Sequence, residues 1–243
     1  MQTRQIDLML LAEGREIVKL GLITYDCAHL KTEQLVNRYI RDNRIDSIEM
    51  FALPYVARKE RVIAFPHRPD MTKAVPTESL AQLKKVSFQR WDGRRPLGSL
   101  CDVFVIGGAG ILDVAFTEGK PVVNGHPGII PLTRGLDSFK WAIYNGDPLG
   151  ITLHIIDAGL DEGDILSIEY TPVFTTDSLE TLARRHYELE IDMLANVIDV
   201  LSQREQPSFD KKPATRRMNA ETEAQMVSKF ENWKADLLNR NTY

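Results

Sequence analysis

The chain has 243 residues, of which 43% are hydrophobic, so it is long enough to bury the core of one large domain. Its formal net charge of −4 argues against a protein that binds nucleic acid through a basic surface, and two cysteines are too few for a disulfide framework. Charged residues interrupt the apolar run near the N-terminus, and no apolar stretch approaches the roughly 20 residues of a membrane span. Composition therefore predicts a globular cytoplasmic protein without a membrane partner.

The first clear elements are a strand, a helix and a second strand. Residues 17–25 (IVKLGLITY) are largely apolar and β-branched, which is typical of a strand. The residues from Asp26 or Cys27 to about Asn43 carry an apolar stripe at helical spacing, and residues 45–56 indicate another strand. This order predicts a βαβ unit and hence a parallel sheet.

Residues 57–100 are the least regular part of the chain. Basic residues are interspersed with prolines there, which predicts a loop. Because the arginine fork suits phosphate, these residues either face a phosphorylated substrate or form an ordinary solvated surface. A short helix over 77–84 and a strand over 86–89 are expected within the segment. The basic residues are Arg58, Lys59, Arg61 and Arg68.

A strand over 101–106 runs into the turn Gly107-Gly108-Ala109-Gly110, and a short helix is expected over 111–118. A glycine-rich turn after a strand lets a ligand approach the backbone closely. The glycine spacing differs from the dinucleotide-binding fingerprint, so the turn alone does not indicate which ligand.

A pair of polar residues follows the next apolar run. Val122-Val123 after Pro121 predicts a strand, and Pro127-Gly128 prevents its continuation. Asn124 and His126 point the same way, because alternate residues of an extended chain share a face. The sequence therefore places an amide and an imidazole side by side at the carboxyl end of a strand, where open α/β sheets bind ligands.

The remaining elements complete an α/β pattern with a short helical extension. We expect a mostly parallel twisted sheet with helices on both faces, with residues 1–205 as the main domain and 206–243 as linker and C-terminal helix. The elements expected are a helix capped by Asp137 or Ser138 that runs to Tyr144, strands over 150–156 and 164–173 around a loop at 157–163, a long helix over 178–203 capped by Ser178, a linker at 206–213 and a helix over 219–238.

Asn124, His126, His154 and Asp161 are expected near one sheet edge, and their chemistry can be narrowed by exclusion. No G-x-S-x-G sequence is present, and Asn-Gly-His is not a metal-binding spacing, so a serine hydrolase and a metal site are both disfavoured. Acyl transfer to a substrate amine remains. An amide and a protonated imidazole can stabilise the oxyanion, and a carboxylate can support the imidazole.

Residues 124–166 resemble the catalytic segment of the formyltransferases that depend on 10-formyltetrahydrofolate. NGHPGIIP (124–131) matches that family's Asn-x-His-Pro-x-Leu-Leu-Pro block, with Ile in place of both Leu. Further along, Arg134-Gly135, Asn145–Asp147, GITLH (150–154) and LDEGDIL (160–166) match four more blocks in order, and GGAGILD (107–113) resembles the glycine-rich turn of the folate pocket.

The resemblance implies a Rossmann-like catalytic domain over residues 1–205 and a role for each site residue. Asn124 would bind the formyl oxygen, His126 would stabilise the oxyanion and shuttle a proton, and Asp161 would orient and charge His126. His154 would lie behind this trio or serve as a core histidine. The co-substrate would be 10-formyltetrahydrofolate, without a metal, held by Gly107, Gly108, Ile111, Leu112, Asp157, Ala158, Gly159 and Leu160. Ser138, Lys140 and Trp141 would face the acceptor or belong to the core or surface of their helix.

The expected acceptor amine follows from disfavouring two of the family's classes of formyltransferase. Methionyl-tRNA formyltransferases carry a substantial further C-terminal domain, whereas only a linker and one helix follow the long helix here. Glycinamide ribonucleotide formyltransferases have a Gly-Ser-rich phosphate loop after the first strand, where this chain has TYDCAHLKTEQL (24–35). We therefore expect a nucleotide-linked amino-deoxysugar, such as one used for lipopolysaccharide O-antigen, and no nucleic acid partner. The alternatives are glycinamide ribonucleotide or another small amine, and a non-catalytic folate-binding protein. The amphipathic tail helix and the family's tendency to dimerise favour a homodimer.

Overall fold

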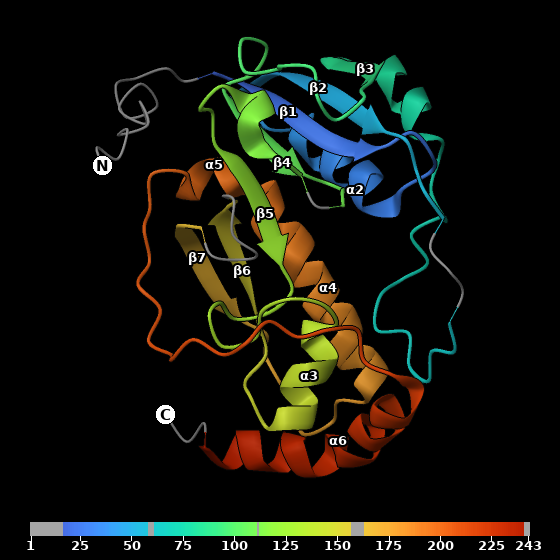
Figure 1. The fold of residues 1–243 in the computed structure, drawn as a ribbon, viewed down its shortest axis with the longest axis vertical. Helices are drawn as coiled ribbons and strands as arrows, with labels where there is room; N and C mark the ends of the chain where they lie inside the picture. The colour runs from blue at the N-terminus through green and yellow to red at the C-terminus, as the bar shows by residue number, and fades with distance from the viewer. Residues whose placement is uncertain (1–16, 58–60, 111, 157–162, 241–243) are drawn as a thin grey trace.

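A seven-stranded sheet in the order β3-β2-β1-β4-β5-β6-β7 organises the computed structural model, which describes residues 17–57, 61–110, 112–156 and 163–240 (Figure 1). The first five strands in this order run parallel, and β6 and β7 are antiparallel to their neighbours, which confirms the predicted, mostly parallel α/β sheet. The strands are β1 (Val18–Tyr25), β2 (Ile45–Leu53), β3 (Val86–Arg90), β4 (Val103–Ile106), β5 (Val122–His126), β6 (Gly150–Ile155) and β7 (Ile165–Tyr170).

The helices follow the predicted order, and most are shorter than predicted, whereas α3 and α6 extend one and two residues beyond their predicted ends. The helix predicted over 178–203 is divided at Asn196, whose side-chain amide donates to the Asp192 carbonyl oxygen at 2.9 Å and so ends the first part. Ser178 caps that helix as predicted, through a reciprocal bond with Thr181. The helices are α2 (Leu30–Tyr39), the 3₁₀ turns η1 (Thr77–Gln82) and η2 (Val114–Thr117), α3 (Ser138–Asn145), α4 (Leu179–Ala195), α5 (Val197–Val200) and α6 (Ala220–Arg240).

Strand β5 ends where the sequence predicts. It spans Val122–His126 and stops before Pro127, so Asn124 and His126 lie at its carboxyl end, opposite His154 and Thr152 of β6. The local sequence does not reveal this pairing, because the partner strand is formed much later in the chain.

The two faces of the sheet are covered differently. One face packs against α2, α4 and α5, with Leu35, Tyr39, Ile191 and Leu194 among the buried side chains. The opposite face packs against residues 91–101 and η2, with Phe104 and Val122 in its core. A third apolar cluster joins α3, the first turns of α4 and α6 (Figure 1).

The strand order reverses between β1 and β4, because the chain first builds β1 to β3 toward one edge and then β4 to β7 toward the other. Ligands of open α/β sheets bind outside the carboxyl ends of the strands at such a reversal. Tyr25 at the end of β1 and Gly107 after β4 lie there, and β5 is the next strand.

In the part of the chain that the structure describes, no helix is both long enough and apolar enough to cross a membrane.

Candidate active site

Four polar side chains lie on one face of the β5–β6 pair. Asn124 is opposite His154 and His126 is opposite Thr152, and residues of both strands that are two apart share a face. His154 and Thr152 are completely buried, His126 is 3% exposed and Asn124 is half-buried. The predicted juxtaposition of Asn124, His126 and His154 is therefore present in the structure.

His154 fixes the orientation of the Asn124 amide. The Asn124 Nδ2 atom lies 3.2 Å from His154 Nε2. Because an amide nitrogen only donates, Nε2 is the acceptor and the neutral His154 ring carries its proton on Nδ1. His154 thus lies behind Asn124 and contacts its amide, and its support of a catalytic trio stays a prediction.

His126 is held by the loop that follows its own strand. Its Nε2 lies 2.8 Å from the Thr133 carbonyl oxygen and 3.2 Å from Ser138 Oγ. The His126 and His154 rings meet edge to face, with centroids 6.4 Å apart and an interplanar angle of 87°. Neither Thr133 nor Ser138 was predicted to contact the site histidine.

The loop from Pro127 to Arg134 folds back over β6. Thr152 Oγ1 donates to the Gly128 carbonyl oxygen at 2.7 Å, and Thr133 Oγ1 accepts from the Ile129 amide at 2.8 Å. The Ile130–Pro131 peptide is cis. A Cβ atom at Gly128 would lie 2.5 Å from the Thr133 carbonyl oxygen and 2.9 Å from His126 Nε2. Only glycine fits at this close approach.

The glycine-rich turn after β4 has a packing role in the structure. The Gly107 and Gly108 amides both donate to the Ile23 carbonyl oxygen, at 2.9 and 3.0 Å. A Cβ atom at Gly108 would lie 2.8 Å from the His29 ring and 2.9 Å from the Tyr25 ring. Leu112 is half-buried against the cluster that contains Phe104. Contact of Gly107, Gly108 and Leu112 with folate stays a prediction.

Several predicted site residues lie outside the described residues. These are the third member of the catalytic trio, Asp161, and the predicted folate contacts Ile111, Asp157, Ala158, Gly159 and Leu160. Their roles stay predictions. Among the residues that the structure does describe, no group of three or more His, Cys, Asp or Glu side chains is arranged to hold a metal ion.

The first turns of α3 contribute to the core and to the site. Ser138 is buried beside His126, whereas Lys140 is completely buried and donates to Glu223 of α6 at 2.7 Å. Trp141 Nε1 donates to the Arg216 carbonyl oxygen at 2.7 Å. Of these three, only Ser138 contacts a predicted catalytic residue.

The basic residues between β2 and η1 are bound to carboxylates. Arg61 contacts Asp137 and Glu223, and Arg68 donates to Glu190 at 2.7 Å. Arg58 and Lys59 lie outside the described residues. Neither Glu190 nor Glu223 was predicted to matter, because a glutamate on a helix usually faces solvent and no local pattern distinguishes these two.

Glu190 and its two cations form a buried charged group near the carboxyl end of β1. Lys31 Nζ lies 2.6 Å from Glu190 Oε1, and the Glu190 side chain is 1% exposed. Burial opposes the charged carboxylate, but Arg68 and Lys31 outweigh it and hold the pKa of Glu190 at about 2. Burial, aided by Lys31 and Arg68, lowers the pKa of His29 to about 4, so His29 is neutral at pH 7.

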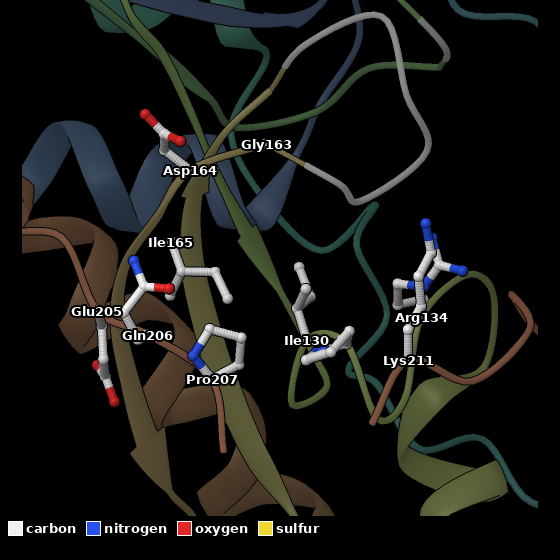
Figure 2. A pocket seen from close by; sticks show the side chains of 10 residues that line it. Ile130, Arg134, Gly163, Asp164, Ile165, Glu205, Gln206, Pro207 and Lys211 are labelled. Atoms are coloured by element: carbon white, nitrogen blue, oxygen red, sulfur yellow. The ribbon is translucent and has the colours of Figure 1, made fainter. Parts of the chain in front are cut away.

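A cavity of about 280 Å³ lies between the loop after β5, the start of β7 and the linker before α6. Figure 2 shows Arg134 and Lys211 on the side opposite Gln206 and Pro207, with Ile130 between them. Ile165 also lines it and is paired with His154, so the cavity adjoins the sheet face that carries Asn124 and His154. Its size approaches that of small-molecule pockets.

Residues 104–198, less than half of the chain, match the formyl transferase family. We call these residues, which are similar to formyl transferases, the formyl transferase segment. The match runs from β4 through most of α4 and includes Asn124, His126, Ser138 and His154.

Related proteins differ in the amine that their names specify. The chain is 33% identical to methionyl-tRNA formyltransferase of Citrifermentans bemidjiense over 84 residues, which are 34% of this chain and 26% of that protein. The chain therefore spans about a quarter of that relative's length.

Two solved structures share the fold over most of the chain. One is a sugar N-formyltransferase from Shewanella sp FDAARGOS_354, with a TM-score of 0.57 and 15% identity over 86% of this chain and 87% of that chain. The other is glycinamide ribonucleotide transformylase 1 from Geobacillus kaustophilus, with a TM-score of 0.53 and 19% identity over 74% of this chain and 97% of that chain.

Proposed function

We propose that this protein transfers a formyl group from 10-formyltetrahydrofolate to a primary amine. The observation that carries the proposal is the arrangement of Asn124, His154 and His126 on one face of β5 and β6, with the Asn124 amide directed by a buried histidine. The formyl transferase segment supplies the reaction class.

The residues present fit the co-substrate. When bound, 10-formyltetrahydrofolate supplies a formyl group whose carbon bonds to the amine nitrogen as its bond to N10 breaks. Asn124 has a second amide hydrogen besides the one directed at His154, and it can donate to the formyl oxygen as negative charge develops there. Leu112, with the predicted contacts of the loop after β6, would provide the apolar wall for the pterin ring.

His126 would carry the proton that balances the transfer. The amine nitrogen gives up one proton when it becomes an amide, and N10 of the folate gains one. A single proton that moves through the buried His126 ring satisfies both changes. Asp161 is the residue proposed to orient that ring and to stabilise its protonated form.

For the acceptor we propose the amino group of a nucleotide-linked amino-deoxysugar, with glycinamide ribonucleotide as the second candidate. Two cations, Lys31 and Arg68, share one carboxylate, Glu190, so the group keeps one excess positive charge while His29 is neutral. Arg68 keeps 31% of its side chain exposed, which supports recognition of an anionic acceptor by this residue. The fold is shared with a sugar N-formyltransferase and with a glycinamide ribonucleotide transformylase, so it is compatible with both candidates.

The cellular setting belongs to the same proposal. Both cysteines, Cys27 and Cys101, carry free thiols, which supports a reducing cytoplasm. A homodimer and a place in lipopolysaccharide O-antigen synthesis remain proposals that depend on the acceptor.

The acceptor is tested with purified protein and 10-formyltetrahydrofolate against a panel of amines. The panel contains amino-sugar nucleotides, glycinamide ribonucleotide and methionyl-tRNA, and the measurement is tetrahydrofolate release together with the mass of the formylated product. We expect turnover with an amino-sugar nucleotide. Turnover with glycinamide ribonucleotide or methionyl-tRNA alone would overturn the sugar assignment and keep formyl transfer.

The site is tested by Asn124→Ala and His126→Ala. Asn124→Ala removes a donor to the developing negative charge, and His126→Ala removes the proton carrier. We therefore expect each substitution to lower kcat by about 10²-fold or more. Asn43→Ala, at an exposed turn, is the matched control and should keep full activity. Folate binding measured by calorimetry, with no turnover of any amine by the unmodified protein, would instead indicate a non-catalytic folate-binding protein.

A further inference from the structure

An exposed tyrosine follows β2 at the carboxyl edge of the sheet. Tyr55 lies two residues after the end of β2 and is 52% exposed, and the next residue, Val56, is 78% exposed. Ligands of open α/β sheets bind outside the carboxyl ends of the strands. The exposed ring is therefore placed where a ligand can cover it.

The Tyr55 ring is held in position although it is exposed. Its backbone amide donates to Asp26 Oδ1 at 3.0 Å, and the Asp26 amide donates to the Leu53 carbonyl oxygen at 2.9 Å, so the ends of β1 and β2 are joined. The ring meets the Tyr25 ring edge to face, with centroids 5.3 Å apart and an interplanar angle of 84°. These contacts orient Tyr55 and leave about half of it open to solvent.

A row of rings leads from Tyr55 toward the buried charged group. Tyr25 also meets the His29 ring edge to face, with centroids 5.6 Å apart. Burial is the main cause of the lowered pKa of His29, and Lys31 and Arg68 add to it, which places both cations near that ring. The two cations share one carboxylate. The row thus begins at an exposed ring and ends at a group with one excess positive charge.

The glycine-rich turn after β4 packs against the same row. A Cβ atom at Gly108 would lie 2.8 Å from the His29 ring and 2.9 Å from the Tyr25 ring. Gly107 and Gly108 are proposed contacts of the folate, so the row borders the proposed folate site. A ligand that covers the row would therefore lie beside the formyl donor.

We propose that Tyr55 binds the nucleobase of the acceptor by stacking, with the phosphates of the acceptor directed toward Arg68. The inference rests on the proposed formyl transfer and deepens it. A nucleoside diphosphate has the same order of groups as the row, with a flat base at one end and anionic phosphates at the other. Every base has a π face that can stack on tyrosine, and the arginine fork suits phosphate.

This assignment separates the two candidate acceptors. Glycinamide ribonucleotide has a phosphate but no nucleobase, so it has no group to stack on Tyr55. An amino-sugar nucleotide has both. The contribution of Tyr55 to binding therefore depends on which acceptor is offered.

Binding is tested first, by calorimetry on the full chain without folate or amine. The probes are the diphosphates of uridine, thymidine, guanosine and cytidine, together with inorganic pyrophosphate. We expect a nucleoside diphosphate to bind more tightly than pyrophosphate. Tyr55→Ala should weaken that binding by about 5- to 150-fold, the range for loss of one stacked base, and should leave pyrophosphate binding unchanged. Tyr55→Phe keeps the ring and should bind like the unmodified protein.

Tyr170→Ala is the matched control for the binding experiment. Tyr170 is 55% exposed, and it lies at the end of β7, at the other edge of the sheet from β3 and β2. This variant should bind every probe like the unmodified protein. Urea unfolding of both alanine variants should give the midpoint of the unmodified protein, because each removes an exposed ring.

Turnover then connects Tyr55 with the reaction. In Tyr55→Ala the KM for an amino-sugar nucleotide should rise by about 5- to 150-fold, with kcat unchanged, because the base is remote from the reacting amine. The KM for 10-formyltetrahydrofolate and any turnover of glycinamide ribonucleotide should also stay unchanged. A purely structural role of Tyr55 would change all of these quantities together.

Three results would overturn the assignment and leave formyl transfer standing. They are no binding of any nucleoside diphosphate, equal binding by the unmodified protein and Tyr55→Ala, and a loss in Tyr55→Phe as large as that in Tyr55→Ala. Binding that depends on Tyr55, in a protein that formylates no amine, would contradict the proposed function and leave the nucleotide site standing.

Discussion

His154 is completely buried, yet it determines how the half-buried Asn124 amide is presented. An asparagine amide that is free to rotate would present its oxygen to the formyl oxygen in part of the population, and two acceptors repel. The His154 Nε2 lone pair removes that alternative. In the proposed formyl transfer, His154 would therefore be a positioning residue for the Asn124 amide.

This role predicts different outcomes for two substitutions of His154. His154→Leu removes the acceptor and should lower kcat by about 10-fold, equivalent to about 1.4 kcal/mol. His154→Gln keeps an acceptor oxygen and should retain more of the activity. Steady-state kinetics measures both, with urea unfolding to correct for the folded fraction. Equal kcat values for the folded Leu and Gln variants would contradict the role.

Some site residues could be predicted from the sequence and others could not, because only some of their contacts follow from local spacing. The sequence could predict that Asn124 and His126 share a face, because side chains of a strand alternate between its two faces. Thr133 contributes a backbone carbonyl, which carries no sequence signal, and Ser138 reaches His126 only because the loop folds back. The resemblance to formyltransferases named His154, but its bond to Asn124 depends on the register of β6.

At the scale of elements, α6 is attached to the rest of the protein by a charged contact as well as an apolar one. Its apolar residues Met226, Phe230 and Trp233 share one face at helical spacing and are buried. Glu223 on the same helix accepts from Lys140 of α3 at 2.7 Å and from the Ala64 amide at 2.6 Å. Burial opposes the charged form, but these bonds outweigh it and lower the pKa of Glu223.

Glu223→Gln should therefore destabilise the protein strongly. It leaves the completely buried Lys140 without a counter-charge, and loss of one partner of a buried ion pair costs about 3–5 kcal/mol. Glu221→Gln, at an exposed position in the same first turn, should change the free energy of unfolding by less than about 0.5 kcal/mol. Urea unfolding compares the two variants, and similar midpoints would refute the prediction.

The start of α3 shows where local rules fail. Asp137 was expected to be a possible cap, but its side chain makes no capping bond to α3 and instead binds Arg61 and the Met218 amide. Capping preference is a local tendency, and the two distant donors compete successfully for the carboxylate.

At the scale of the whole molecule, Glu190 connects parts of the chain that are far apart in sequence. Through Lys31 and Arg68 it joins α4 to α2 and to the segment between β2 and η1, which runs along one side of the molecule (Figure 1). Its Cγ also lies 3.3 Å from where a Cβ of Gly125 would be. The group thus supports β5 from the face opposite Asn124 and His126.

Stability should depend on pH through this carboxylate. Its folded pKa of about 2 lies below the ordinary 4.5, so its contribution is fully present above pH 4.5 and is lost as pH falls toward 2. The loss is on the order of 3 kcal/mol. Urea unfolding between pH 7 and pH 3 should show this decline in the unmodified protein and in Glu188→Gln, an exposed control on α4. A decline just as steep in Glu190→Gln would contradict the assignment.

Those parts of the fold that depend on residues close together in the sequence could be predicted. The βαβ unit at residues 17–56 and the Asn–Gly–His strand follow from periodicity and handedness. The antiparallel direction of β6 and the position of β3 at one edge of the sheet depend on pairings between distant segments, which no window of the sequence contains.

The position of β5 in the sheet also bears on when the site can exist during synthesis. Asn124 needs His154 of a later strand, Asp137 needs Met218, and Arg61 needs Glu223. At about 5–20 residues per second, the ribosome delivers Glu223 about 5 to 20 s after Asn124. A nascent chain therefore exposes its Asn–Gly–His sequence for seconds before the partners that arrange it have been made.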